Sequence, residues 1–260
     1  MPFLQNNGIR YYQFEIFPER ITQAVFTRHG GVSPAPWASL NVGGSVGDDV
    51  WHVRENRIRS FVALGRAPGS VYDVWQVHSA DVVYADAPRR MDAEYQHKAD
   101  IILTDNPDVT LFMRFADCTP VLLYDPVKHV AGIVHSGWLG TVRGAARAAV
   151  EAMQARFDSD PVDLLAAIGP SIGPDHYEVG EDVIVQVKHA FGADAPALLE
   201  KYGERSHFNL WAANRLLLEQ AGVTQIESAQ ICTACNTADW FSHRGEKGKT
   251  GRFGAMLALS

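Results

Sequence analysis

Short apolar segments, separated by polar turns, make up most of this chain. Segments rich in aromatic and β-branched residues are typical of β-strands. They predict strands over 11–17, 21–27, 71–77, 100–103, 110–115, 121–124, 130–134, 164–168, 226–231 and 253–259. The segments at 110–115, 121–124 and 130–134 are almost continuously apolar, which indicates strands that are covered on both faces.

Apolar residues that recur every three or four positions predict helices between these strands. The first helix begins after the capping pair Asp48 and Asp49 and ends near Leu64. Further helices are predicted over 141–157, 181–190, 195–202 and 210–221. No linker, low-complexity tract or internal repeat divides the chain, so we expect a single domain over 1–260. The interleaving of strands and helices predicts a layered α/β fold with mixed β-sheets.

The amino-acid composition excludes several classes of protein. Of 260 residues, 47% are apolar and 20% are charged, which excludes a disordered chain. A formal net charge of −7 and a pI near 5.8 argue against a dedicated nucleic-acid binder. The N-terminus lacks a signal-peptide pattern, and no uncharged apolar run approaches the roughly 20 residues of a membrane helix. Three cysteines do not make a disulfide framework. We therefore expect a cytoplasmic protein without nucleic-acid or membrane partners, and the sequence does not indicate an oligomeric state.

Three side chains of chemical interest lie at the ends of apolar strands in the central part of the chain. They are His78, Cys118 and His135. Side chains at strand ends leave the sheet and line clefts. Two imidazoles and a thiolate suit zinc, and three protein ligands leave a fourth position for water or substrate, as in catalytic sites. Such a metal lowers the pKa of bound water towards about 7 and so provides a nucleophile at neutral pH.

The same three residues allow two other interpretations. Cys118 could be a nucleophile that His135 or His78 activates, as in cysteine hydrolases. Alternatively, Cys118 is a small core residue and the histidines are hydrogen-bonded structural residues. The wide spacing of the three residues matches no short-range metal motif, so spacing does not decide among these interpretations.

A glycine-rich turn from Ser136 to Gly140 precedes the predicted helix over 141–157. The start of a helix attracts anions through its exposed N–H groups, although a tight strand-to-helix turn also needs glycine. Loops elsewhere carry arginines, which bind phosphate or carboxylate in a bidentate manner but are equally compatible with solvated loops. The candidate substrate-binding residues are Arg28, His29, Asp117, Gly137, Arg143, Arg244 and Arg252.

A C-x-x-C pair, Cys232 and Cys235, occurs late in the chain. A zinc ribbon needs a second such pair, and the sequence has none. A thioredoxin-type pair lies between a strand and the start of a helix. This pair follows a late strand and no helix is predicted after it, which argues against a redox role. We therefore interpret Cys232 as a buried packing residue.

Ordered motifs along nearly the whole chain carry a resemblance to a known family. The motifs are TRHGGVS (27–33), SLNVG (39–43), VGDD (46–49), ENR (55–57), QVH (76–78), ADC (116–118), HSGW (135–138), IGPSIGP (168–174), YEVG (177–180), CT (232–233) and TGR (250–252). With them the chain resembles the purine nucleoside phosphorylase family that was long labelled the multicopper polyphenol oxidase, or laccase, domain.

The resemblance implies a layered α/β fold similar to that of the deamidase domain of cytotoxic necrotizing factor. It implies a site in which His78, Cys118 and His135 are both the catalytic residues and the zinc ligands. The implied activities are phosphorolysis of adenosine, inosine, guanosine and methylthioadenosine, together with adenosine deamination. The implied partners are therefore a purine nucleoside and phosphate. Some bacterial members are described instead as peptidoglycan-editing factors.

The chain departs from the family pattern at three positions near these motifs. Ser136 stands where the family commonly has Ala, Leu139 where it has Arg, and His243 where it has Tyr. If the family's arginine contacts phosphate, Arg143 or Arg28 would have to take its place.

The leading functional hypothesis is a zinc-dependent purine nucleoside enzyme. The first alternative is a cysteine hydrolase or peptidoglycan-editing enzyme that uses Cys118 and His135 and needs no metal. A polyphenol oxidase with copper is disfavoured, because multicopper oxidases need several His-x-His pairs and the ten histidines here include none. A non-enzymatic binding module is disfavoured by the grouping of His, Cys and Arg residues.

Overall fold

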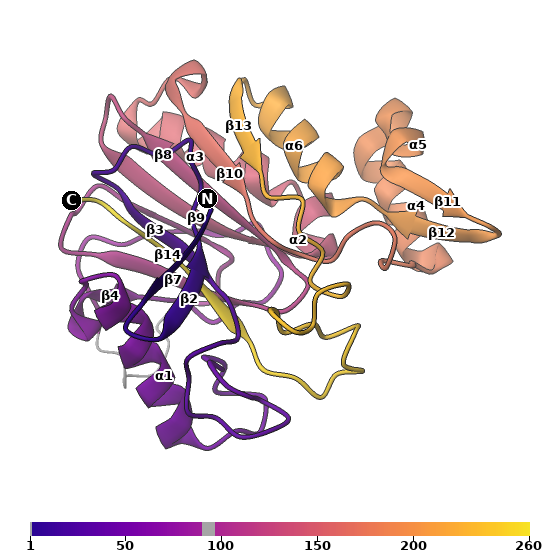
Figure 1. Ribbon diagram of the computed structural model, residues 1–260. Coiled ribbons are helices and arrows are strands. Elements are labelled where there is room, and N and C mark those ends of the chain that lie inside the picture. The colour runs from indigo at the N-terminus through magenta and orange to yellow at the C-terminus, as the bar shows by residue number, and fades with distance from the viewer. Residues whose placement is uncertain (1, 90–96) are drawn as a thin grey trace.

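Two six-stranded β-sheets pack face to face at the centre of the protein, and helices lie on their outer faces (Figure 1). The computed structural model describes residues 2–89 and 97–260. The core between the sheets is mainly aromatic and aliphatic, and Phe115, Tyr124 and Phe253 are fully buried in it. This architecture confirms the predicted single-domain α/β fold with mixed sheets.

The first sheet has the strand order β1-β2-β3-β14-β7-β4. Its bounds are β1 Phe3–Asn6, β2 Ile9–Tyr12, β3 Thr22–Phe26, β14 Phe253–Ala258, β7 Thr110–Phe115 and β4 Val71–Tyr72. Helix α1 (Val50–Ala63) covers its outer face, where the rings of Phe61 and Phe112 have centroids 5.5 Å apart. Asp49 caps α1 as predicted, since its side chain accepts a hydrogen bond from the N–H of Trp51.

The second sheet has the strand order β13-β10-β8-β9-β6-β5 and carries the site described below. Its bounds are β13 Gln225–Ser228, β10 Leu165–Ile168, β8 Thr119–Asp125, β9 Val130–Ser136, β6 Ile101–Thr104 and β5 Val82–Tyr84. Helices α3 (Ala145–Phe157) and α6 (Leu210–Gln220) cover its outer face. The buried face of α3 is formed largely by alanines, so its backbone lies close to the sheet.

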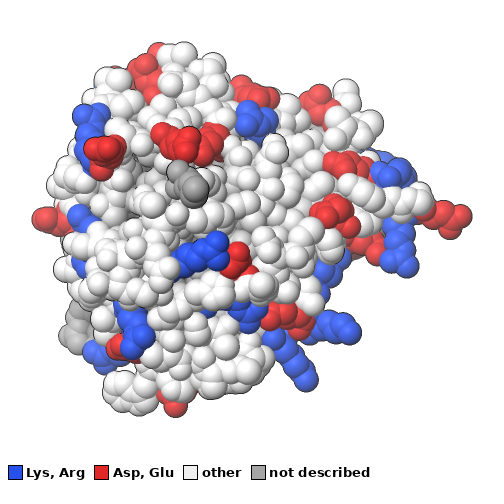
Figure 2. All heavy atoms as spheres, in the orientation of Figure 1, with Lys and Arg blue, Asp and Glu red and all other residues white. Residues whose placement is uncertain are grey.

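The remaining elements extend from one side of the second sheet (Figure 1). They are α2 Trp138–Val142, α4 Glu181–Phe191, the 3₁₀ helix Gly192–Asp194, α5 Ala195–Leu198 and the hairpin of β11 Leu199–Tyr202 and β12 Arg205–Phe208. Two other 3₁₀ helices, Pro68–Ser70 and Pro161–Asp163, precede β4 and β10. On the face shown in Figure 2, basic and acidic side chains of the described residues are interspersed. None of the helices in the described part of the chain has the length and apolar character needed to cross a bilayer.

The predicted helix over 195–202 is wrong in its second half. The helix α5 ends at Leu198, and the chain then enters β11, which pairs antiparallel with the unpredicted strand β12. Gly203 supplies the left-handed backbone conformation in the turn between these strands, with a φ of 65°. Cross-strand pairing therefore overrides the helical spacing of the apolar residues here.

Several other predicted boundaries are also wrong. The helix expected over 141–157 consists of α2 and α3, which are separated at Gly144, a residue with a φ of 76°. The strands expected over 11–17 and 71–77 end at Tyr12 and Tyr72, and the short strands β1 and β5 were not predicted. The residues that follow β2 and β4 include Phe14 and Val74, which are buried without belonging to a strand. Their apolar character reflects core packing rather than strand pairing.

A buried ion cluster connects the two strands that lead towards the site. Asp73, directly after β4, contacts the guanidinium groups of Arg57, Arg89 and Arg114, with Oδ2 2.7 Å from Nη1 of Arg114. Its side chain is fully buried. Three residues further on, the Gln76 side chain donates to the Arg114 carbonyl at 2.8 Å and accepts from its N–H at 3.1 Å. This cluster therefore holds the segment that ends at His78 against β7.

We predict that Asp73→Asn destabilises the protein by about 3–5 kcal/mol, because it leaves buried guanidinium groups without their counter-charge. The matched control is Glu55→Gln, which removes a carboxylate from an exposed pair with Arg59 and should cost less than about 1 kcal/mol. Urea unfolding of both variants measures the difference. Equal losses in the two variants would contradict the role given to Asp73.

Candidate active site

Strand register brings the predicted trio to one edge of the second sheet. Strand β9 runs antiparallel to both β6 and β8, so the end of β9 lies beside the starts of its two neighbours. His135 is the penultimate residue of β9 and is paired with Pro120 of β8, while Cys118 immediately precedes β8. His78 lies in the segment before β5, which runs parallel to β6. The three residues therefore converge although they are far apart in the sequence.

The three side chains lie close enough to share one ligand. One donor atom from each of His78, Cys118 and His135 lies within 4.8 Å of the others. Cys118 Sγ is 3.9 Å from Nε2 of His78, and the two imidazole rings have centroids 4.9 Å apart. His135 is buried, Cys118 is half-buried and His78 is exposed. Exposure to solvent thus increases from His135 to His78, so the trio is open to solvent on the side of His78.

Asp100, at the start of β6, orients two members of the trio. Its Oδ1 is 2.7 Å from Nδ1 of His135, and its backbone carbonyl accepts the His135 N–H at 2.8 Å. Its Oδ2 accepts the N–H groups of Val77 and Ser79, the two neighbours of His78, at 3.0 and 2.7 Å. A carboxylate on Nδ1 fixes the ring orientation and directs Nε2 towards the site, as in carboxylate–histidine–metal arrangements. Burial opposes the charge on Asp100, yet these hydrogen bonds and His135 keep its pKa below the ordinary value.

Two of the residues at the site have an unusual backbone conformation. His78 and Asp117 have φ angles of 60° and 80°, in the left-handed region that non-glycine residues seldom adopt. The hydrogen bonds from Val77 and Ser79 to Asp100 hold the turn at His78. Strained conformations of this kind persist where the surrounding contacts determine them, and they are frequent at functional sites.

Gly137 packs directly against the trio. A Cβ atom at this position would lie 2.7 Å from Sγ of Cys118 and 3.2 Å from Cδ2 of His78. Its φ of −76° is ordinary for any residue, so the requirement for glycine here is purely steric. The turn expected at 136–140 is shorter than predicted, because Ser136 still belongs to β9 and α2 begins at Trp138.

Charge coupling makes the trio chemically reactive. Burial alone would raise the pKa of the Cys118 thiol, but the charge of His135 and hydrogen bonds with both histidines lower that pKa to about 6. Burial would lower the pKa of His135, whereas Cys118 and Asp100 raise it to about 9. Between these values, Cys118 is a thiolate beside an imidazolium. The thiolate is the form of cysteine that binds metals and attacks electrophiles.

Five of the predicted substrate-binding residues lie around the trio or in the loops beside it. Gly137 contacts it directly, and Arg143 donates from Nη1 to the His78 carbonyl at 2.8 Å. Asp117 accepts the backbone N–H of Arg244 at 2.7 Å. Arg252 is half-buried, and this burial lowers its pKa, while the charges of Cys118 and Asp117 act in the opposite direction.

Arg28 and His29 are paired with residues of the segment between β13 and β14 and have no contact with the trio among the described interactions. Nη1 of Arg28 donates to the Thr237 carbonyl at 2.6 Å and pairs with Glu246 at 3.0 Å, and its guanidinium lies over the ring of Phe241. Nε2 of His29 is 2.8 Å from Oδ1 of Asp239. These contacts tie the N-terminal loop to the segment before β14. Their role in binding substrate stays a prediction.

Two further residues, Asp100 and Tyr177, belong to this site although no sequence pattern predicted a role for them. Asp100 was predicted only as the first residue of a strand, although a carboxylate that opens an apolar strand is itself a signal of a buried partner. Tyr177 was noted only within a motif, yet burial and then the charge of Cys118 raise its pKa, which indicates that the phenol lies near the thiolate. The ring of Tyr177 also carries the guanidinium of Arg244, 5.3 Å from its centroid.

The interpretation of Cys232 as a buried packing residue stays a prediction, and the structure adds polar contacts that the sequence did not indicate. Cys232 is half-buried, and its Sγ accepts the backbone N–H groups of Gly173 and Cys235 at 3.2 and 3.4 Å. It belongs to a second group of possible metal ligands, with Cys235, Asp175 and His176. This grouping could not be predicted from local patterns, because the four residues come from two segments that only the fold brings together.

Comparisons with known proteins confirm the resemblance inferred from the motifs. The family model described as multi-copper polyphenol oxidoreductase laccase matches residues 22–260. A protein of Deinococcus radiodurans named purine nucleoside phosphorylase is 40% identical over 239 residues, which cover 92% of this chain and 89% of that protein. The purine nucleoside phosphorylase YfiH of Escherichia coli is 33% identical over 93% of this chain and 95% of its own length. The crystal structure of YlmD from Geobacillus stearothermophilus superimposes with a TM-score of 0.92 at 33% identity, covering 99% of this chain and 98% of that one.

We predict that Gly137→Ala weakens metal binding and activity while the fold is retained, because the added methyl group would displace the Cys118 thiol. The control is Gly69→Ala, where a Cβ atom would meet no heavy atom within 4 Å. Metal titration and circular dichroism of both variants measure the two effects. Wild-type metal affinity in Gly137→Ala would show that the thiol can move without loss.

We also predict that the metal-free protein acquires a thiolate as the pH rises through about 6, because His135 stabilises the anion of Cys118. The measurement is ultraviolet thiolate absorbance in a background with Cys232→Ser and Cys235→Ser. His135→Ala removes the stabilising charge, so the midpoint should move up to or above the ordinary value of about 8.5. A midpoint that does not respond to this change would exclude the coupling between the two side chains.

Proposed function

This chain belongs to the multi-copper polyphenol oxidoreductase laccase family, and we propose that it is a zinc-dependent purine nucleoside enzyme. The proposed reactions are phosphorolysis of adenosine, inosine, guanosine and methylthioadenosine, together with deamination of adenosine. The observation that carries the proposal is the convergence of His78, Cys118 and His135 within 4.8 Å, in a family whose curated relatives are named purine nucleoside phosphorylases.

The donor set fits zinc. Two imidazole nitrogens and one thiolate sulfur are ligands that zinc prefers, and three protein ligands are typical of its catalytic sites. Asp100 holds Nδ1 of His135, which leaves Nε2 as the ligand atom. The low pKa of Cys118 supports the proposal, because a ligand thiol has to be deprotonated. When bound, the metal would act as a Lewis acid and activate water at neutral pH.

The arginines around the trio suit the phosphate that phosphorolysis requires. In that reaction the ribose C1′ becomes positively charged as the purine leaves, so the enzyme has to hold phosphate beside C1′ and stabilise charge on the base. Arg143, whose guanidinium donates to the His78 carbonyl, and the half-buried Arg252 are the candidates for binding the phosphate. The family commonly has arginine at the position of Leu139. Because leucine cannot bind phosphate, Arg143 would contribute more to phosphate binding in this chain. Tyr177, whose phenol stays protonated, is a candidate donor to the purine.

A second candidate function is a cysteine hydrolase, including a peptidoglycan-editing activity. The observation that favours it is the pairing of a Cys118 thiolate with His135, which in turn is oriented by Asp100. A nucleophile, a base and an orienting carboxylate in series are the components of a catalytic triad. The two proposals differ in whether Cys118 holds a metal or attacks the substrate.

Product analysis distinguishes the two functions. Zinc-loaded protein is incubated with adenosine, with and without phosphate. We expect adenine and ribose 1-phosphate when phosphate is present, and inosine with ammonia from deamination. Metal should also protect Cys118 from iodoacetamide. Rapid alkylation of Cys118 in the zinc-loaded protein, or a covalent substrate adduct on it, would favour the hydrolase.

We predict that Asp100→Asn lowers metal affinity by about 10–100-fold and lowers both activities, because it disturbs the orientation of His135 and of the turn at His78. The matched control is Asp105→Asn, at the exposed position directly after the other end of β6. Metal titration, kcat and KM are measured for both. Unchanged metal affinity in Asp100→Asn would remove the positioning role of this carboxylate.

A further inference from the structure

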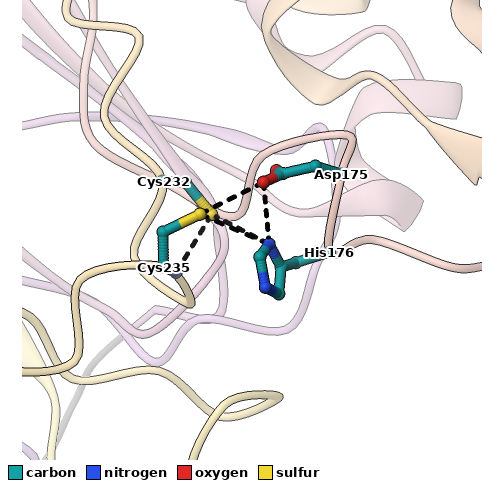
Figure 3. A group of neighbouring side chains, drawn as sticks. All are labelled: Asp175, His176, Cys232 and Cys235. Atoms are coloured by element: carbon teal, nitrogen blue, oxygen red, sulfur yellow. Dashed lines mark hydrogen bonds and ion pairs between the residues drawn. The ribbon is translucent and has the colours of Figure 1, made fainter.

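A second group of soft and hard metal ligands lies on the side of the molecule where α2 and the C-terminal loops meet. Figure 3 shows Asp175, His176, Cys232 and Cys235 with their side chains turned towards one another. Asp175 and His176 come from the loop between β10 and α4, and the two cysteines follow β13. The four ligand atoms all lie within 4.8 Å of one another. Nothing in the proposed nucleoside chemistry uses these residues.

The distances within this cluster are close to the edges of a zinc tetrahedron, although three of the four would have to change by a few tenths of an ångström. Nδ1 of His176 lies 3.9 Å from Sγ of Cys232 and 3.3 Å from Sγ of Cys235. Oδ2 of Asp175 lies 3.1 Å from Sγ of Cys235 and 2.9 Å from Nδ1 of His176. With zinc–sulfur bonds of about 2.3 Å and zinc–nitrogen or zinc–oxygen bonds of about 2.0 Å, tetrahedral geometry requires ligand separations of about 3.3–3.8 Å. Small side-chain movements would therefore place all four atoms around one ion.

The backbone around the cluster is arranged for close approach of the ligands. The N–H groups of Gly173 and Cys235 both donate to Sγ of Cys232, at 3.2 and 3.4 Å, and so fix the position of this sulfur. A Cβ atom on Gly173 would lie 2.6 Å from Oδ1 of Asp175 and 3.1 Å from Cβ of Cys232. Glycine at position 173 thus allows the two segments to approach each other. Ser171 and Cys232 form a β-bridge that holds the segments in register.

The charge balance of the cluster also calls for a cation. Two thiolates and one carboxylate would together carry three negative charges. The neighbouring positive charge is Arg244, whose Nη1 donates to the carbonyls of His176 and Glu178. That guanidinium would balance the charge that remains after a divalent ion has bound.

We propose that Asp175, His176, Cys232 and Cys235 bind a second Zn²⁺ ion in a structural site. Four protein ligands close the coordination sphere, as in structural zinc sites, whereas the trio at His78 leaves a position open. Thiolate ligands in a tetrahedral set select zinc over magnesium or calcium. The C-x-x-C pair therefore shares the ion with Asp175 and His176 instead of with a second pair of cysteines.

The second ion would stiffen one wall of the first site. Thr233, between the two cysteines, donates its hydroxyl to Oδ1 of Asp117 at 2.7 Å. Asp117 precedes Cys118, has a left-handed backbone conformation and also accepts the N–H of Arg244. A metal that joins 175–176 to 232–235 would thus hold the loop that presents Cys118. The second zinc acts through position rather than through contact with substrate.

Zinc stoichiometry of the full chain tests this inference. Wild type that is saturated with zinc and then desalted should retain two ions per chain. The double variant Cys232→Ser and Cys235→Ser should retain one, held by the trio. The double variant His78→Ala and Cys118→Ser should also retain one, held by the cluster. The control Asn236→Ser, in the same loop but outside the ligand set, should retain two.

Cobalt spectra of the same variants assign the sites separately. In the His78→Ala and Cys118→Ser chain, one equivalent of Co²⁺ should give the visible bands of a tetrahedral ion with two thiolate ligands. Adding Cys235→Ser should abolish the two-thiolate spectrum. If the trio binds no metal, the proposed function fails but this spectrum remains. If the trio binds metal and this spectrum is absent, the second site is refuted and the proposed function stands.

Alkylation of wild type needs no substitution and therefore does not depend on the folding of any variant. Cys235 is exposed, so iodoacetamide should label it readily in the reduced, metal-free protein. Zinc should protect both Cys232 and Cys235, as mapped by mass spectrometry, and should raise Tm by about 10 °C at zinc concentrations far above Kd. Equal labelling with and without zinc, or a Cys232–Cys235 disulfide that persists in reductant, would overturn the proposal.

Discussion

The buried carboxylate of Asp100 is the interaction on which the candidate active site depends. One oxygen holds the ring of His135, and the other holds the two backbone N–H groups that flank His78. A carboxylate without partners would be costly at this depth, so its hydrogen bonds have to be retained whenever the protein is folded. Since one group orients two histidines from different segments of the chain, the geometry of the trio is a consequence of core formation rather than of loop flexibility.

Strand pairing in the second sheet is the second constraint on the geometry of the trio. Because β9 is antiparallel to both of its neighbours, strand ends and strand starts alternate along one edge of the sheet. The end of β9 therefore lies between the starts of β6 and β8, and these positions carry His135, Asp100 and Cys118. On the other sheet, the buried cluster around Asp73 fixes the segment that carries His78. Residues held by both sheets form the site, so a substitution that destabilises either sheet should also change the geometry of the trio.

Asp117 connects the active site with the cysteine pair. It precedes Cys118, and its two oxygens accept hydrogen bonds from Thr233 and from the backbone of Arg244. The C-terminal loops are thus part of the wall around the thiolate, although they contribute no residue to the trio. The proposed second zinc would hold these loops in place. Its four ligand residues would therefore influence the position of Cys118 although none of them belongs to the trio.

Apolar periodicity in the sequence determined the α/β class, the central strands and the capped helix α1, because those patterns report local backbone structure and burial. Residue chemistry identified His78, Cys118 and His135 as candidates, and the motifs identified the family. Local patterns do not encode strand register, so the role of Asp100 and the grouping of Cys232 with His176 could not be predicted. The same reason explains the wrong helix over 195–202, where pairing between β11 and β12 outweighs helical spacing. Tertiary structure decided which polar residues meet, because partners such as Ser79 and Asp100, or Asp117 and Arg244, lie 21 and 127 positions apart in the chain.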